Sequence, residues 1–265
     1  MSNKVNSSLY QESRYKTGDN KSFKVNIDNL ALVIDSTYKY SDAWPLYFNG
    51  VEKYFPKDIK KYIFTDKYDL DIENVIPIYY DNNDSYRNQF LGCLKQVKEK
   101  YIIYNSEDYI LYDNVNMDII HSFIDVLEKD TTYDFIKFIK GPEITREHEH
   151  KDLHIIDKSK NFFAQQASIW KTESFVKIFE NSIPENGRMQ QEPLGSGVCI
   201  KLGLGGLQHN TGTEVKRGNH HWDSQIFPSM ATAITKGKWN MKEYGDLLAP
   251  LFKEHNINPN KRGII

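Results

Sequence analysis

The sequence predicts an α/β fold, in which a mixed, mostly parallel central sheet is flanked by helices within a single domain. Short apolar segments of strand length alternate along the chain with longer segments whose apolar residues recur at helical spacing. Acidic residues directly follow several of the strand-like segments. No internal repeat, low-complexity tract or linker divides the sequence.

The composition limits the size, the partners and the compartment. With 265 residues, of which 39% are hydrophobic, the chain can bury a substantial core. The formal net charge of −2 gives no general basic field, which argues against nucleic acid as a partner. Cys93 and Cys199 are too few for a disulfide framework and suit a reducing compartment. The N-terminus is unlike a signal peptide and no apolar run has the length of a membrane span, so we expect a cytoplasmic protein.

The first half of the chain alternates strands and helices as a parallel sheet requires. Residues 1–26 are polar and without periodicity, and we expect a loose N-terminal arm there. Ser85 is the expected N-cap of the second helix. The expected elements are a strand at residues 30–34, a helix at 44–55, strands at 60–65 and 74–80, a helix at 85–100 and a strand at 101–104.

The second half is less regular, and its central part carries no clear periodicity. Residues 141–161 are polar and rich in histidine, and residues 188–212 are rich in loop-forming residues. The expected elements are a helix at 114–129, strands at 133–141 and 161–170, a helix at 171–180 and a terminal helix at 241–255 interrupted by Pro250.

Acidic residues stand at the ends of the predicted strands. Asp35, Asp66 and Asp81 each close one, and Glu107 and Asp108 stand side by side after the fourth. Any one such Asp is most simply explained by helix capping or turn chemistry. In open α/β sheets, however, ligands bind at the carboxyl ends of the strands, where several acids would converge. Adjacent carboxylates repel each other, so this pair indicates either a tight exposed turn or a site for a cation.

Glycine and histidine clusters carry weaker signals. The glycines at 195, 197, 203, 205 and 206 match neither phosphate-binding glycine motif, and we interpret them as a flexible loop beside a site. His148, His150 and His154 lack the HExxH motif, so a solvated charged loop is the simpler interpretation. His221, in "NHHWDSQ", would complete a metal site with Asp108, although a surface turn explains it equally well.

Basic and aromatic residues come together in "TKGKWN". Lys236 and Lys238 carry two ammonium groups beside Trp239, a combination that can hold a diphosphate and stack on a ring. A polar strand end next to a buried Trp is the equally simple alternative.

Together these segments resemble nucleotide-sugar-dependent glycosyltransferases of the GT-A fold, most closely the bacterial and viral members that modify surface glycans. The likeness covers about residues 29–240 and rests on the order of its motifs. They are "DSTYKYSDAWPLYFNGVEKYFP", "SYRNQFLGCLKQVKEKYIIYNSEDYIL", "QQASIWKTESF", "QQEPLGS" and "AITKGKWN". The family's acidic motif is usually Asp-x-Asp or two aspartates, whereas this chain has Ser106-Glu107-Asp108.

The resemblance implies a GT-A-like, Rossmann-related sheet with a donor half at about residues 27–140 and an acceptor half at about 141–265. It implies an inverting hexosyltransferase that moves a sugar from a nucleotide-diphosphate sugar to a glycan or lipid-linked acceptor, with peripheral membrane contact allowed. Asp108, more than Glu107, would bind Mn²⁺ or Mg²⁺, with His221 as a third ligand.

The remaining roles divide between the donor and the acceptor. Glu192 matches the family's acceptor-side acidic segment and would activate the acceptor hydroxyl as a base, alongside Asp108 as the second catalytic residue. Pro193 would hold Glu192 in an extended conformation. The residues expected to bind the nucleotide sugar are Asp35, Ser36, Thr37, Asp66, Arg87, Glu107, Lys236, Lys238 and Trp239.

Two other functions fit the same residues. One is a nucleotidyltransferase that uses the same cleft for a nucleoside triphosphate. The other is a noncatalytic domain that binds carbohydrate or a partner protein on a degenerate scaffold of this kind.

Overall fold

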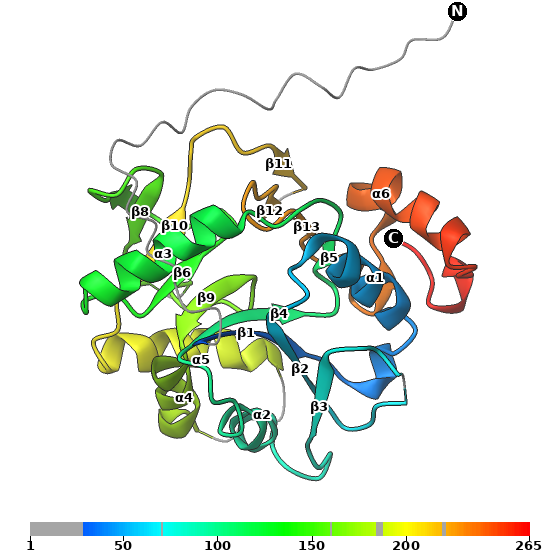
Figure 1. Cartoon of the computed structure of the whole chain (residues 1–265), viewed down its shortest axis with the longest axis horizontal. Helices are drawn as coiled ribbons and strands as arrows, with labels where there is room; N and C mark the ends of the chain where they lie inside the picture. Colours follow the sequence, from blue (N-terminus) through cyan, green and yellow to red (C-terminus); the bar gives the residue numbers. More distant parts are fainter. Residues whose placement is uncertain (1–28, 70, 160, 184–187, 219–220) are drawn as a thin grey trace, which may run out of the picture.

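The computed structural model describes residues 29–69, 71–159, 161–183, 188–218 and 221–265. Nine strands form one sheet in the order β3-β2-β1-β4-β9-β6-β10-β8-β7 (Figure 1). Their bounds are β1 Leu30–Asp35, β2 Lys60–Thr65, β3 Val75–Tyr79, β4 Tyr101–Ser106, β6 Phe135–Lys137, β7 Thr145–Glu147, β8 Leu153–Ile156, β9 Ser168–Lys171 and β10 Gly206–His209. The arm expected at residues 1–26 lies outside the described residues.

The sheet is mixed and mostly parallel, which confirms the predicted fold class. Strands β3, β2, β1 and β4 are parallel neighbours, and β6 pairs with β10 in parallel. Strands β9 and β8 make antiparallel pairs on both of their sides, so they run against the other strands of this sheet.

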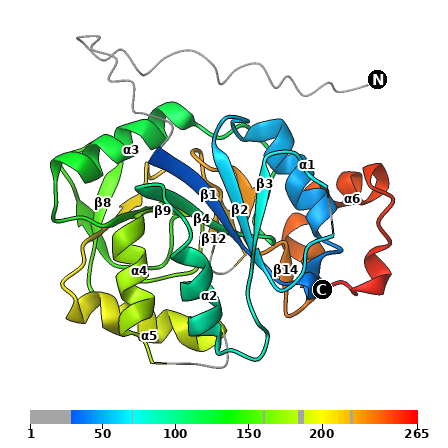
Figure 2. The same cartoon turned by 60° about the horizontal axis from the view of Figure 1, so that its bottom comes forward.

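Helices cover both faces of the sheet. One hydrophobic core includes residues of α1, α3 and α6, and the other includes residues of α2, α4 and α5. Figures 1 and 2 show α3 and α1 on the opposite side of the sheet from α2, α4 and α5. The helices are α1 Trp44–Tyr54, α2 Tyr86–Leu94, α3 Met117–Lys129, α4 Thr172–Asn181, α5 Arg188–Lys201 and α6 Met241–Glu254.

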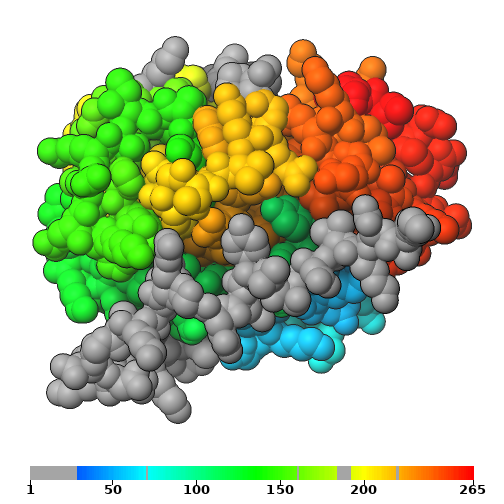
Figure 3. Space-filling model, turned by 90° about the horizontal axis from the view of Figure 1, so that it is seen from above, coloured from blue at the N-terminus to red at the C-terminus, as the bar shows by residue number. Residues whose placement is uncertain are grey.

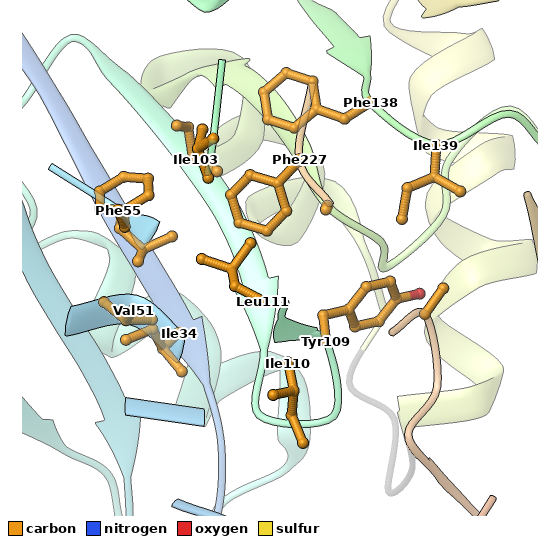
Figure 4. Packing of buried hydrophobic residues seen from close by; sticks show 14 of the residues in the cluster. Ile34, Val51, Phe55, Ile103, Tyr109, Ile110, Leu111, Phe138, Ile139 and Phe227 are labelled. Carbon is orange, nitrogen blue, oxygen red and sulfur yellow. The ribbon is translucent and has the colours of Figure 1, made fainter. Parts of the chain in front are cut away.

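Three small two-stranded antiparallel sheets complete the described fold. They pair β5 Ile110–Leu111 with β13 Ser229–Met230, β11 Lys216–Arg217 with β12 His221–Trp222, and β14 Ile234–Thr235 with β15 Lys238–Trp239. Near β5, Phe227 stacks on Phe138 with ring centroids 5.8 Å apart (Figure 4). The green segments and the orange-to-red C-terminal segments lie on opposite sides of the face in Figure 3, with amber segments between them.

Several predicted boundaries are confirmed and several are wrong. Ser85 is the N-cap of α2 and accepts a hydrogen bond from the backbone of Asn88, but α2 ends well before residue 100. Residues 141–161 contain the β7–β8 hairpin, and β9 occupies only the end of the strand expected at 161–170. Non-helical backbone interrupts α6 at Tyr244, not at Pro250. The Tyr244 hydroxyl donates to the Ala231 carbonyl at 2.7 Å, a tertiary contact that local sequence does not show.

The loop expected around residues 188–201 is the helix α5. Close packing explains the glycine at position 195, because a Cβ there would lie 2.5 Å from the Phe163 ring. Ser196 Oγ accepts a hydrogen bond from the Phe163 backbone N–H at 3.0 Å. Pro193 lies inside this helix, so Glu192 is helical and not extended. Tertiary contacts therefore outweigh the poor helix propensity of this composition.

The glycines after α5 also have fixed positions. Gly203 has φ +75°, and hydrogen bonds from Gly203 N–H to Ile200 O and from Leu204 N–H to Cys199 O terminate α5. These glycines therefore end a helix and pack against neighbours, instead of forming the flexible loop that we expected.

Replacement of Gly206 by Ala should destabilise the protein by about 1–3 kcal/mol, because the new methyl group overpacks the core. Its Cβ would lie 2.2 Å from the ring of Phe135, which is fully buried and stacks on Trp170 at a centroid distance of 4.0 Å. Gly92→Ala is the matched control, since nothing lies within 4 Å of that Cβ in α2. Urea unfolding midpoints should fall for the first variant and not for the second. Equal midpoints for Gly206→Ala and wild type would show that β10 shifts freely away from Phe135.

Candidate functional site

The parallel register brings the predicted strand-end residues to one edge of the sheet. Asp35 pairs with Phe64 of β2 and with Ser106 of β4, and Thr65 pairs with Tyr79 of β3. The acids at the ends of β1, β2 and β4 therefore lie along the same carboxyl edge, as the sequence predicts. Asp81 instead accepts hydrogen bonds from the backbone and side chain of Asn83, which is the turn chemistry of the simpler alternative.

Asp35 and Ser36 support this edge from within. Asp35 is 2% exposed, and its Oδ2 accepts hydrogen bonds from the hydroxyls of Tyr86 at 2.8 Å and Tyr104 at 3.3 Å. Ser36 is fully buried, and its Oγ accepts a hydrogen bond from Trp44 Nε1 at 2.8 Å. This arrangement favours an indirect role for Asp35, through the tyrosines that it orients, over direct contact with a ligand.

Asp66 joins the ends of β1 and β2. Its Oδ1 accepts from the backbone N–H of Tyr38 at 2.7 Å and from the hydroxyl of Thr37 at 3.0 Å, and Oδ2 accepts from Asn82 at 2.9 Å. Partial burial alone raises the pKa of Asp66, but these hydrogen bonds outweigh it and hold the pKa below its ordinary value. Asp66 and Thr37 thus form one polar unit, with Asp66 still partly exposed.

The two adjacent acids after β4 have different surroundings. Glu107 is 3% exposed, whereas Asp108 is half-buried and accepts a hydrogen bond from Ser106 Oγ at 2.6 Å. The backbone N–H of Tyr109 donates to Ser106 O at 3.0 Å and closes the turn. Asp108 is therefore the more accessible of the two acids. The tight turn, one of the two explanations for the pair, is present, and the cation site stays a prediction.

Tyr109 follows the acidic pair directly and is buried. Burial raises the pKa of Tyr109 well above its ordinary value, and the charges of Asp108 and Glu192 raise it further. Glu192, in α5, is half-buried, and its Oε1 accepts a hydrogen bond from the backbone N–H of Gln165 at 2.8 Å. Gln165 Nε2 in turn donates to the hydroxyl of Tyr86, which donates to Asp35, so hydrogen bonds link Glu192 to the end of β1.

A buried ion pair that the sequence analysis does not predict joins β6 to the segment that follows it. Lys137 Nζ lies 2.6 Å from Glu143 Oε1, with both side chains at most 3% exposed. Burial lowers the pKa of Lys137, while Glu143 and then Glu192 oppose this effect. The only local signal was the lysine within the apolar strand "FIKF". Its partner lies six residues later in a segment to which no element was assigned.

Arg87 does not face the site as expected. Its Nε donates to Phe179 O at 2.7 Å, Nη2 donates to Glu180 O at 2.9 Å, and Nη1 donates to Asn88 Oδ1 at 2.9 Å. The guanidinium therefore satisfies carbonyl groups at the C-terminus of α4, a favourable place for a cation. The diphosphate role predicted for Arg87 is corrected to a structural one.

The predicted stacking role of Trp239 is also wrong, because its ring is fully buried in the core. Trp239 packs edge-on against Phe252 with ring centroids 4.9 Å apart. Lys236 and Lys238 beside it are exposed. Lys236 and Gly237, with φ of 52° and 75°, form the two-residue turn between β14 and β15. The hairpin therefore hides the aromatic ring and presents the two ammonium groups.

Arg262 fastens this hairpin to the segment that follows β1. Its guanidinium pairs with the carboxylate of Asp42, and Nε lies 3.0 Å from Asp42 Oδ2. It also donates to Gly237 O at 3.4 Å and lies over the rings of Tyr40 and Trp239, at 4.7 and 5.5 Å from their centroids. Residues more than 200 positions apart thereby hold the hairpin that carries Lys236 and Lys238 to the segment that follows β1.

The predicted three-residue metal site does not form. Within the described ranges, no three His, Cys, Asp or Glu side chains gather in a way that could hold a metal ion, so His221 does not join Glu107 and Asp108. The neighbouring His220 lies outside the described residues. Mg²⁺ and similar cations in nucleotide sites use one or two carboxylates plus ligand phosphates. The hard oxygen ligands of Asp108, half-buried at the sheet edge, fit that kind of coordination.

A well-defined cavity lies away from the candidate site. Its volume is about 910 Å³, and it opens at the amino end of β4, near Lys100 and Tyr101 and the first turn of α4. Lys95 pairs with Glu180 there, and Lys100 pairs with Glu128. This cavity shares no residue with the candidate site.

No protein-family model and no curated protein matches this sequence. Among solved structures, the bifunctional IspDF from Campylobacter jejuni is similar at 13% identity and a TM-score of 0.43, over 75% of this chain and 52% of that chain. S. aureus TarS 1-349 is similar at 11% identity and a TM-score of 0.44, over 73% of this chain and 59% of that one. A CMP:2-keto-3-deoxy-manno-octonic acid synthetase complexed with CTP is similar at 9% identity and a TM-score of 0.42, over 68% of this chain and 88% of that chain.

These likenesses concern the arrangement of the chain alone. The chain spans about half the length of the IspDF chain and 59% of the TarS chain. None of the helices in the described ranges is long and apolar enough to cross a membrane. Function must therefore be argued from the residues of the site.

Arg87→Ala should destabilise the protein by about 1–3 kcal/mol, because two carbonyl groups at the end of α4 lose a charged donor. Lys236→Ala is the matched control, since that side chain is exposed on a hairpin turn. Chemical unfolding midpoints should separate the two variants. A wild-type midpoint for Arg87→Ala would mean that its contacts with α4 contribute nothing to stability.

Proposed function

We propose that this protein is a glycosyltransferase that moves a sugar from a nucleotide-diphosphate sugar to a hydroxyl group of a glycan or lipid-linked acceptor. The main support is the path of hydrogen bonds from Glu192 through Gln165 and Tyr86 to Asp35. Asp35 lies at the carboxyl edge of the parallel strands and pairs with Ser106, whose Oγ donates to Asp108. Asp108 follows the central strand of the donor half, and Glu192 comes from a helix of the acceptor half. The motif order in the sequence supports this class of reaction.

The donor would lie along the edge formed by the ends of β1, β2 and β4. Asp66 and Thr37 are the polar groups available to base or ribose, held together by their hydrogen bond. Asp108 would hold a divalent cation together with the diphosphate. Such a cation neutralises the charge that develops on the leaving group. Lys236 and Lys238 supply further positive charge from the hairpin turn.

Glu192 would act on the acceptor. One of its oxygens is held by the N–H of Gln165, which leaves the other oxygen to take the proton from the acceptor hydroxyl. The hydroxyl oxygen then forms the new bond to the anomeric carbon as the bond to the diphosphate breaks on the opposite face. The nucleoside diphosphate leaves with the electron pair of that bond.

Product analysis distinguishes this proposal from its alternatives. Nucleotide sugars incubated with the protein and Mn²⁺ should release a nucleoside diphosphate over time. Release of pyrophosphate from a nucleoside triphosphate and a sugar phosphate would instead indicate a nucleotidyltransferase. If no nucleotide or nucleotide sugar raises the melting temperature, the scaffold is noncatalytic, because a ligand that binds the folded state must stabilise it.

Asp108→Asn should lower metal-stimulated release of nucleoside diphosphate by about 10²–10³-fold, since one preorganised charge at a leaving group is worth that much. The substitution keeps the size of the side chain and removes its charge. Asp113→Asn, at an exposed position shortly after β5, is the matched control. Unchanged activity in Asp108→Asn, together with resistance to EDTA, would leave Lys236 and Lys238 to carry the diphosphate charge.

Glu192→Gln should lower kcat by about 10²–10⁴-fold, the usual contribution of a general base, with little change in the KM for the nucleotide sugar. The amide keeps an oxygen for the Gln165 N–H, so the position of the side chain is preserved. Steady-state kinetics at saturating acceptor measure this directly. Wild-type turnover in the variant would contradict the role of Glu192 and favour a retaining mechanism or another acid, such as Asp223.

A further inference from the structure

Gln165 touches both sides of the candidate site. It lies in the segment before β9 and is half-buried. Its backbone N–H holds Glu192 Oε1 at 2.8 Å, and its side-chain Nε2 lies 2.5 Å from the hydroxyl oxygen of Tyr86. The same residue therefore contacts the acceptor-side base and a tyrosine that is anchored at the end of β1.

The direction of each hydrogen bond in this chain is fixed. The Tyr86 hydroxyl has one proton and gives it to Asp35 Oδ2 at 2.8 Å. Tyr104 donates to the same oxygen at 3.3 Å, so the carboxylate acts as acceptor for both phenols. Towards Gln165, the Tyr86 oxygen can therefore only accept. The amide nitrogen of Gln165 must face Tyr86, and its carbonyl oxygen Oε1 must point away from it.

Gln165 Oε1 is thus an oriented acceptor. In the part of the chain that the structure describes, the hydrogen bonds of Gln165 use its backbone N–H and Nε2, and none uses Oε1. Oε1 is also absent from the buried polar atoms that lack a hydrogen-bond partner, as expected for an atom open to solvent. A side-chain oxygen in a fixed orientation, on the residue that holds the base, is a suitable receptor for a hydroxyl group.

We propose that Gln165 is a specificity-determining residue whose Oε1 accepts a hydrogen bond from a second hydroxyl of the acceptor, next to the hydroxyl that reacts. The inference rests on the proposed function and assigns the acceptor class as a neutral sugar with neighbouring hydroxyls. A phosphate monoester offers mainly acceptor oxygens, so it cannot satisfy Oε1 in the same way. A site that hydrogen-bonds one hydroxyl discriminates strongly against analogues that lack it.

The test uses methyl hexopyranosides and their monodeoxy analogues as acceptors, with the nucleotide sugar that stabilises the wild type most. Gln165→Met keeps the backbone N–H for Glu192 and the approximate shape of the side chain, but removes Oε1. The KM for the best glycoside should rise about tenfold or more, with a smaller fall in kcat, since a lost hydrogen bond of this kind is worth about that factor. The preference for this glycoside over its deoxy analogue should fall towards unity. Gln96→Met is the matched control, because the Nε2 of this exposed residue donates to Gly92 O in α2, away from the candidate site.

Tyr86→Phe provides an independent variant. It leaves Oε1 present but removes the oxygen that orients the amide, so the same loss of discrimination should appear to a smaller extent. An unchanged preference and acceptor KM in Gln165→Met would overturn the inference, even if Tyr86→Phe alone has an effect. If the wild type releases no nucleoside diphosphate from any nucleotide sugar, the proposed function fails and the inference fails with it. If the wild type transfers the sugar and Gln165→Met keeps the wild-type acceptor KM and preference, the inference fails and the proposed function stands.

Discussion

Parallel pairing of β1 on both of its sides is the constraint on which the rest of this structure depends. Residues 30–34 are at most 2% exposed, so apolar side chains fill both faces of the strand. A slip of one residue would move every side chain to the opposite face and carry Asp35 out of its place among Tyr86 and Tyr104. Because the register is fixed, the ends of β2 and β4 stand level with Asp35, and the acids after them meet at one edge.

Burial of Asp35 then links distant parts of the chain. A carboxylate at 2% exposure is costly unless hydrogen bonds replace its water, and the two tyrosine hydroxyls do so. Tyr86 comes from α2 and Tyr104 from β4, and Gln165 extends the chain of hydrogen bonds to Glu192 in α5. The buried Asp35 at the end of β1 is thus linked to the side chain of Glu192 in α5. The two halves of the site are coupled through four side chains and one backbone N–H.

The sequence was sufficient where the information is local, and it failed where the outcome depends on a distant partner. Apolar periodicity located the four parallel strands, most helices and the Ser85 cap. It could not show that Gly195 belongs to a helix, because the reason is the approach of Phe163. Likewise the guanidinium of Arg87 is a typical phosphate ligand, but in this structure it donates to carbonyl groups at the C-terminus of α4. Trp239 beside two lysines suggested a stacking platform, whereas the core required its ring.

Burial of Trp239 also explains why the exposed Lys236 and Lys238 have a defined position. Its ring is anchored in the core, and its backbone pairs with the C-terminal segment through hydrogen bonds with Gly263 and Ile265. Arg262 adds its contact with Asp42, in the segment that follows β1. The short turn between β14 and β15 therefore has little freedom, and the ammonium groups that it carries cost less conformational entropy to place than those of lysines on a loose loop. Burial of Trp239 therefore fixes the position of the hairpin that carries the two lysines.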